Sequence, residues 1–146
     1  MMAKKEQQKT KVPAKQEKYF EAVGRRKTAV ARVRILGTVE KKNVSINGRP
    51  LESYFSIKKH QGVAMSPVHA VGLKNVYPVS VKVNGGGIAA QADAVRLGIA
   101  RALILINPSW RAALKALGYL KRDPRRVERK KFGSRKARRP QQWRKR

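Results

Sequence analysis

Two stretches of the chain alternate between apolar and other residues, which predicts β-strands. In residues 28–36 one face carries Ala29, Ala31, Val33 and Ile35, and the other carries Thr28, Val30, Arg32 and Arg34. In Tyr77–Val83 the predicted inward positions are Val79, Val81 and Val83. Because successive side chains of a strand point to opposite faces, each stretch is expected to cover a core with its apolar face.

Two shorter strands are predicted from local sequence. Tyr19–Val23 precedes Gly24 and the basic cluster Arg25–Lys27. Val44–Ile46 is closed by Asn47-Gly48, a dipeptide that favours tight hairpin turns.

Helical periodicity extends from about Ala89 to Ile106. Apolar residues recur there at steps of three and four: Ile88, Ala92, Val95, Ile99, Leu103 and Ile106. Asn107 can cap a second helix that begins at Pro108 and ends near Leu117, with Gly118 as its stop.

The region between the short strand and the second alternating strand is less regular. Pro50–Phe55 is predicted to form a helical turn with its two aromatic residues in the core. Ile57–Val71 is predicted to form a short helix followed by a loop, because Gly62 and Pro67 interrupt its pattern.

This order of elements predicts an α+β fold, with a mostly antiparallel sheet and helices on one face. Residues 19–120 have the length of one ordinary domain. Residues 1–18 are rich in Lys and Gln, which predicts a disordered basic extension. Residues 121–146 are predicted to form an extended basic tail.

Charge indicates the class of partner. The chain of 146 residues has a net charge of +28, and residues 121–146 hold 14 Lys or Arg against two acids. Residues 19–120 hold 16 bases and four acids, so the foldable part is basic too. The tail has too few apolar side chains to bury a core, and it is expected to become ordered on a polyanion. RNA is therefore the favoured partner.

Several other classes are excluded. The absence of Cys excludes a disulfide scaffold, thiol catalysis and Cys-based metal sites, and it is compatible with a reducing cytosol. The longest apolar run, Ala102–Ile106, is five residues long, whereas a membrane span needs about 20. Residues 1–18 lack the apolar region of a secretory signal.

Few features could carry catalysis. Gly85–Gly87 precedes a predicted helix, but no Lys-Ser/Thr follows as in a P-loop. We favour a tight strand-to-helix turn there, and an RNA phosphate on Gly85, Gly86 and Gly87 is the alternative. His60 and His69 each stand alone and are interpreted as structural or RNA-facing. No acids are spaced for acid–base or two-metal work, so no enzyme, cofactor or metal site is expected.

The basic face of residues 28–36 has two interpretations. It could be a solvated surface. Because it adjoins the cluster Arg25–Lys27, contact with phosphate is the favoured interpretation.

Three blocks of residues carry a family resemblance. The first is Gly24–Val33, and the second is Gly85–Ile88 with Gln91, Ala92, Arg96 and Gly98–Leu103. The third is Arg122-Asp123 with Val127–Lys131, Gly133 and Arg135–Gln141. In this order, over about residues 19–146, they resemble the bacterial type of the small-subunit ribosomal protein S nine family.

The resemblance implies both fold and function. The implied fold is that of the second domain of ribosomal protein S five, with a left-handed βαβ crossover. The implied function is that of a structural protein of the small subunit in the cytoplasmic ribosome. Such a protein binds the 3′ major (head) domain of 16S-type rRNA beside other head proteins, with no membrane partner.

The resemblance also implies that the tail threads through rRNA and reaches the anticodon stem-loop of P-site tRNA. By position the tRNA-binding tip is Arg144, Lys145 and Arg146. The usual family ending is aromatic-Ser-Lys-Arg, so Trp143 matches the aromatic residue and Arg144 replaces Ser. One Gln is extra at Gln141-Gln142. The expected rRNA-binding residues are Arg25, Arg26, Lys27, Arg32, Arg34, Lys121, Arg122, Arg125, Arg126, Arg129, Lys130, Lys131, Arg135, Lys136, Arg138 and Arg139.

Two other functional classes stay open. A histone-like or architectural DNA-binding protein also joins basic tails to a small core. A phosphate-handling enzyme built around Gly85–Gly87 would have to bind or turn over nucleotides.

Overall fold

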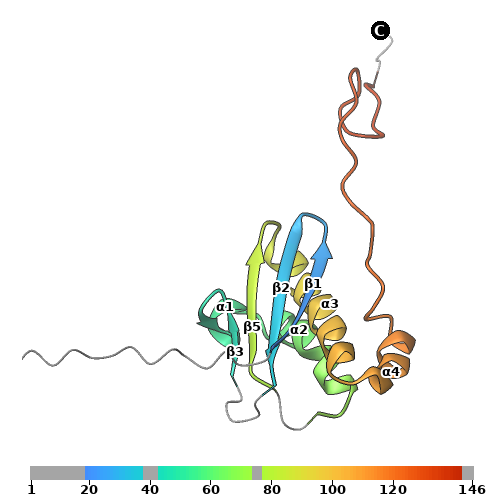
Figure 1. The fold of residues 1–146 in the computed structure, drawn as a ribbon. Coiled ribbons are helices and arrows are strands. Elements are labelled where there is room, and N and C mark those ends of the chain that lie inside the picture. The colour runs from blue at the N-terminus through green and yellow to red at the C-terminus, as the bar shows by residue number, and fades with distance from the viewer. Residues whose placement is uncertain (1–18, 38–42, 74–76, 143–146) are drawn as a thin grey trace, which may run out of the picture.

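The computed structural model describes residues 19–37, 43–73 and 77–142 (Figure 1). In chain order its elements are β1 (Tyr19–Arg26), β2 (Ala29–Leu36), β3 (Val44–Ile46), β4 (Arg49–Pro50), α1 (Leu51–Tyr54), α2 (Lys58–Ala70), β5 (Val79–Asn84), α3 (Ile88–Ile106), the 3-10 turn η1 (Pro108–Trp110) and α4 (Arg111–Ala116). The order of larger elements agrees with the prediction, and β4 is an addition. The predicted extension, residues 1–18, lies outside the described residues.

The strands form one sheet in the order β1-β2-β5-β3-β4. Within it only β3 and β5 pair in parallel, which confirms the mostly antiparallel sheet. The register aligns Ala22, Val33, Val81 and Ile46 across four strands. Asn47 and Gly48 both have positive φ, as a tight turn between β3 and β4 requires.

The core lies between one face of the sheet and the helices. α3 packs across β1 and β2, and α2 packs on α3 (Figure 1). The alternating residues predicted to point inward are buried, and four members of the predicted helical stripe cover them: Ala92, Val95, Ile99 and Leu103. Ile88, the first residue of the predicted stripe, lies outside the core, because it is 58% exposed.

The prediction of a short helix and a loop over residues 57–71 was wrong, because α2 is continuous through Pro67. Proline cannot donate a backbone hydrogen bond to the carbonyl four residues earlier, that of Val63. The Ser66 hydroxyl donates to that carbonyl instead, at 2.8 Å. Pro67 is fully buried, so packing also holds it in place.

The boundaries of two other elements differ from prediction. β1 continues through Gly24 and Arg25 to Arg26, and the turn falls at Lys27, whose φ is +51°. The second predicted helix is divided into η1 and α4. Its predicted caps are confirmed: Asn107 Oδ1 accepts from Ser109 N at 3.0 Å, and Gly118 has a φ of +72°.

Candidate nucleic-acid interface

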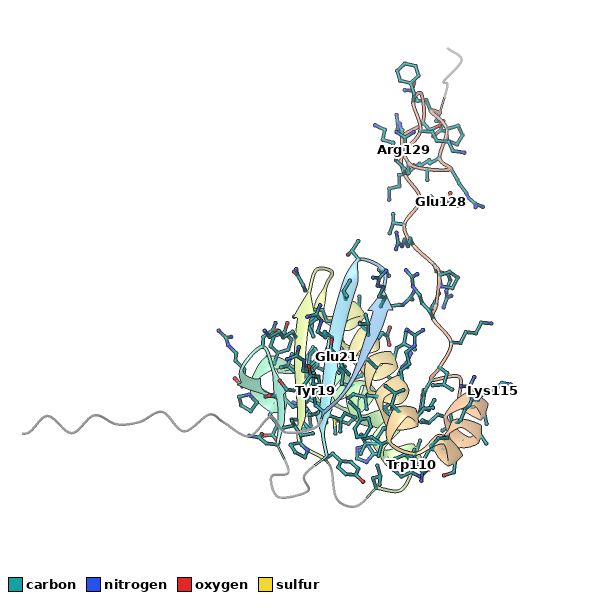
Figure 2. All side chains as sticks on the ribbon, viewed as in Figure 1. Tyr19, Glu21, Trp110, Lys115, Glu128 and Arg129 are labelled. Atoms are coloured by element: carbon teal, nitrogen blue, oxygen red, sulfur yellow. The ribbon has the colours of Figure 1, made fainter. Side chains whose placement is uncertain are left out.

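The basic tail leaves the globular part after Leu120 and runs away from it (Figure 1). Residues 121–142 contain no helix, and their only strand-like pairing is an isolated bridge between Ser134 and Pro140. Every Lys and Arg in this segment is exposed. Figure 2 shows side chains around Glu128 and Arg129 projecting from the thin tail far from the sheet.

The far end of the described tail closes on itself, and we call residues 128–140 the tail loop. Glu128 and Arg138 form a two-pronged ion pair, with N–O distances of 2.6 and 3.0 Å. Within the loop that this ion pair closes, Arg135 N donates to the Arg139 carbonyl at 2.8 Å. The Arg138 side chain lowers the pKa of the Glu128 carboxyl below its usual range. Arg138 therefore already has an acidic partner within the chain.

The root of the tail is tied to the globular part by a cluster of five charged residues, which we call the latch. Arg26 Nη2 lies 2.9 Å from Asp123 Oδ2, and its Nε lies 3.5 Å from Asp93 Oδ2. Arg26 Nη1 also donates to the carbonyls of Asp123 and Arg125, at 3.4 and 3.2 Å. Arg96 pairs with Asp93 at 3.3 Å, and Arg125 pairs with Asp123 at 2.8 Å.

The latch gives Arg26 a different environment from its neighbours. Its side chain is only 16% exposed, whereas Arg25 and Lys27 face solvent. The alternation along β1 explains this, because Arg26 falls on the inward side with Ala22 and Gly24. Of the three cations predicted from the cluster, Arg25 and Lys27 remain available to an external phosphate, and Arg26 is engaged within the protein.

The Asp123 carboxylate of the latch keeps its charge at ordinary pH. Hydrogen bonds from the Arg125 side chain and backbone, together with the nearby charge of Arg26, hold the pKa of the Asp123 carboxyl well below its usual range. A lowered carboxyl pKa stabilises the folded arrangement above the unperturbed value of about 3.9. This contribution is lost only as the pH falls through the lowered pKa.

The latch predicts that Arg26→Gln loosens the tail root. In limited trypsin digestion of the free chain, cleavage after Lys121 and Arg122 should become several-fold faster relative to cleavage after Lys130. Arg25→Gln removes a neighbouring exposed cation and should leave this ratio unchanged. The ratio of the two cleavage rates is measured by mass spectrometry. If it were equal in wild type and Arg26→Gln, Arg26 would not restrain the root of the tail.

The outer face of the sheet is less basic than the sequence suggested. Arg34 Nε lies 2.7 Å from Glu21 Oε2, and Arg32 Nε lies 3.3 Å from the other oxygen of the same carboxylate. The Arg34 guanidinium also lies over the Tyr19 ring, 4.9 Å from its centroid. Hydrogen bonding and charge from Glu21 raise the pKa of Arg34. Arg32 is thus exposed and Arg34 is partly exposed, and both share an acid on the neighbouring strand.

The register adds Lys82 to this face. It lies opposite Arg32, and both line a shallow hollow with Val30 and Asn84. Lys82 was missed as a site residue, although the alternation of Val79, Val81 and Val83 already placed it outward. Glu21 was also missed, because only the pairing of β1 with β2 brings it beside the two arginines.

The glycine turn fits closely against the first hairpin. Gly85 and Gly86 have φ values of +71° and +70°, and side chains there would meet Thr28 O at 2.7 Å and Ala29 Cβ at 2.9 Å. The turn therefore requires both glycines without any ligand. Gly87 faces open space at the start of α3. A phosphate contact at Gly85–Gly87 stays a prediction.

Comparison with known proteins identifies the family. The sequence profile of ribosomal protein S9/S16 matches residues 24–146. The chain belongs to this family. It is 46% identical over 138 residues to the small ribosomal subunit protein uS9 of Synechococcus sp. (strain JA-3-3Ab), covering 94% of this chain and 99% of the relative. The uS9 of Trichormus variabilis is 50% identical over 84% of this chain and 88% of its own length.

The match confirms the resemblance that the three sequence blocks carry, since all of them lie in residues 24–146. The family is a structural and non-enzymatic one. No helix in the described ranges is long and apolar enough to cross a membrane, and no group of acids or histidines there could hold a metal ion. The predicted tip, Arg144–Arg146, lies outside the described residues.

Proposed function

We propose that this ribosomal protein is a structural constituent of the small subunit in the cytoplasmic ribosome, where it binds the 3′ major (head) domain of 16S-type rRNA. The globular part would lie beside other head proteins, and the tail would thread through the RNA. The left-handed crossover that the family implies would join β3 to β5, a parallel pair whose connection runs through β4, α1 and α2.

The exposed tail cations carry this proposal. Both acids of residues 121–142, Asp123 and Glu128, are held by arginines of the chain itself. No ion pair within the described ranges engages the remaining cations: Lys121, Arg122, Arg126, Arg129, Lys130, Lys131, Arg135, Lys136 and Arg139. An extended segment with such excess positive charge suits the phosphate backbone of a folded RNA.

The structure divides the predicted rRNA contacts into two groups. Arg26, Arg125 and Arg138 are ion-paired along the tail and serve first to shape it. Arg25, Lys27 and the unpaired tail cations supply the phosphate contacts, and Arg32 and Arg34 contribute less because they share Glu21. Gly87 is the backbone position best placed for an additional phosphate.

Two measurements test the proposal. In a sucrose gradient of cell extract, the tagged chain should travel with small subunits, and tagged chain free of them would contradict the assignment. In solution, the purified chain should prefer a transcript of the 3′ major domain to duplex DNA at matched salt. Equal affinity for the two would favour an architectural DNA-binding protein.

We further propose that Arg144, Lys145 and Arg146 contact the backbone of the P-site tRNA anticodon stem-loop. The support is the family match, which extends to residue 146, and the direction in which the described tail leads away from the globular part (Figure 1). A terminal cluster of cations can hold phosphate without reading bases, which suits a site that must accept every tRNA.

Deleting Arg144–Arg146 should leave subunit assembly intact, because the anchoring cations lie upstream. P-site tRNA affinity should fall by about 1–2 kcal/mol, with a larger loss at low salt, since three charge-assisted contacts in partly hydrated surroundings are removed. A variant with Lys at all three positions should keep most of the affinity. Normal tRNA affinity and dissociation across a salt series after the deletion would show that the tip does not touch tRNA.

A further inference from the structure

Phe132 is the most exposed large apolar side chain of the described residues. Its relative exposure is 107%, whereas Phe55 in the core is 0% exposed. Val127, just before the tail loop, is 90% exposed. The chain itself leaves this ring uncovered, and removing a benzyl group from water is favourable, so a partner that covers Phe132 would gain binding free energy from it.

The tail loop holds Phe132 at a defined position. The ion pair between Glu128 and Arg138 closes the neck of the loop. Around Phe132 in the chain, Ser134 N donates to the Lys131 carbonyl at 3.3 Å, and Gly133 has a φ of +75°. Phe132 therefore lies at a turn inside a closed loop, where a flat ring can be presented outward.

The surroundings of Phe132 select the chemistry of the partner. It follows three consecutive cations, Arg129–Lys131, and the other limb of the loop adds Arg135 and Lys136. The loop's acid, Glu128, is occupied by Arg138. An apolar groove on another protein would have to accept this positive charge at close range. A nucleic acid offers phosphates for the cations and bases for the ring.

We infer that Phe132 stacks on an unpaired base of RNA, while the cations of the tail loop hold the flanking phosphates. This inference rests on the proposed function and deepens it, because it assigns a base-contacting residue within an otherwise phosphate-binding tail. Single-stranded loops and bulges are the RNA elements whose bases are free to stack on an aromatic ring.

A substitution series on the full chain tests stacking against simple apolar contact. With the 3′ major domain transcript, Phe132→Ala and Phe132→Leu should each weaken binding by roughly 5- to 150-fold, with no change in salt slope, because stacking needs a flat ring and involves no counterion. Phe132→Tyr should stay within about twofold of wild type, since its ring still stacks. Val127→Ala, the matched exposed control, should have no effect. Full affinity in Phe132→Leu, or no loss in Phe132→Ala, would overturn the inference.

A fluorescent reporter separates this inference from the proposed function. In Phe132→Trp, the emission in excess of wild type should be quenched by single-stranded oligoadenylate and unaffected by duplex DNA. Because this measurement does not depend on a preference for rRNA, it can detect stacking even if the chain shows no such preference. If single-stranded RNA did not quench the excess emission, the stacking of residue 132 would be overturned. A preference of the chain for rRNA would still support the proposed function.

Discussion

Replacing Gly24 by alanine is expected to lower the free energy of unfolding of the globular part by about 1–3 kcal/mol or more. A Cβ atom at this position of β1 would lie 1.9 Å from the Ala94 carbonyl oxygen and 2.5 Å from Gly98 N. Both atoms belong to the backbone of α3, so no side chain can rotate away. The strand and the helix would have to separate, which would open the core along β1 and β2.

Urea unfolding of the full chain, followed by circular dichroism, measures this change. Gly62→Ala is the matched control, because Gly62 is exposed in α2 with open space around its Cα. That substitution should be neutral or stabilise by roughly 0.5–1 kcal/mol through lower chain entropy in the unfolded state. A Gly24→Ala variant as stable as wild type would show that β1 and α3 are not in close contact.

Removing unpaired cations from the tail loop should reduce the salt dependence of rRNA binding. Replacing Arg129, Lys130, Lys131 and Arg139 by Gln should lower the slope of log K against log salt by about three units, at roughly 0.7–0.9 per lost phosphate contact. The equal-charge control replaces Lys58, Lys59, Arg111 and Lys115, which are exposed on α2 and α4. If the slope fell by a similar amount in both variants, the slope would depend on net charge and not on local phosphate contacts.

Arg138 and Arg139, which are adjacent in the tail loop, allow a more specific test of the salt dependence. Arg139 has no acidic partner within the described ranges, whereas Arg138 pairs with Glu128 at 2.6 Å. Arg139→Gln should therefore reduce the slope by about one contact, and Arg138→Gln should reduce it by clearly less. Equal effects would show that RNA displaces Glu128 from Arg138.

The sequence predicted the sheet well because period-two alternation depends only on which face is buried. Val33 and Val81 followed this pattern and are buried. It predicted α2 poorly because Pro67 is normally a helix breaker, and its compensation depends on one hydroxyl of Ser66. A local pattern cannot indicate whether such a side chain will turn back to the carbonyl.

The candidate site was predicted in composition but not in arrangement. The charge density of residues 121–142 can be recognised without knowledge of the fold, and every Lys and Arg there is exposed, while the binding of RNA by this segment stays a prediction. The sequence grouped Arg26 with Arg25 and Lys27, because Asp123 meets Arg26 only through the tertiary structure. The same limit applies to Glu21, which neutralises part of the basic face from the neighbouring strand.

The close approach of Gly24 to Gly98 also constrains the order in which the chain folds. The first hairpin joins neighbouring residues and can form early, whereas its cover, α3, comes from much later in the sequence. Closing that long intervening loop must precede any gain from packing β1 on α3. During synthesis, a chain that ends before Gly98 therefore leaves the inner face of its first hairpin largely uncovered, and the core can close only once α3 has been made.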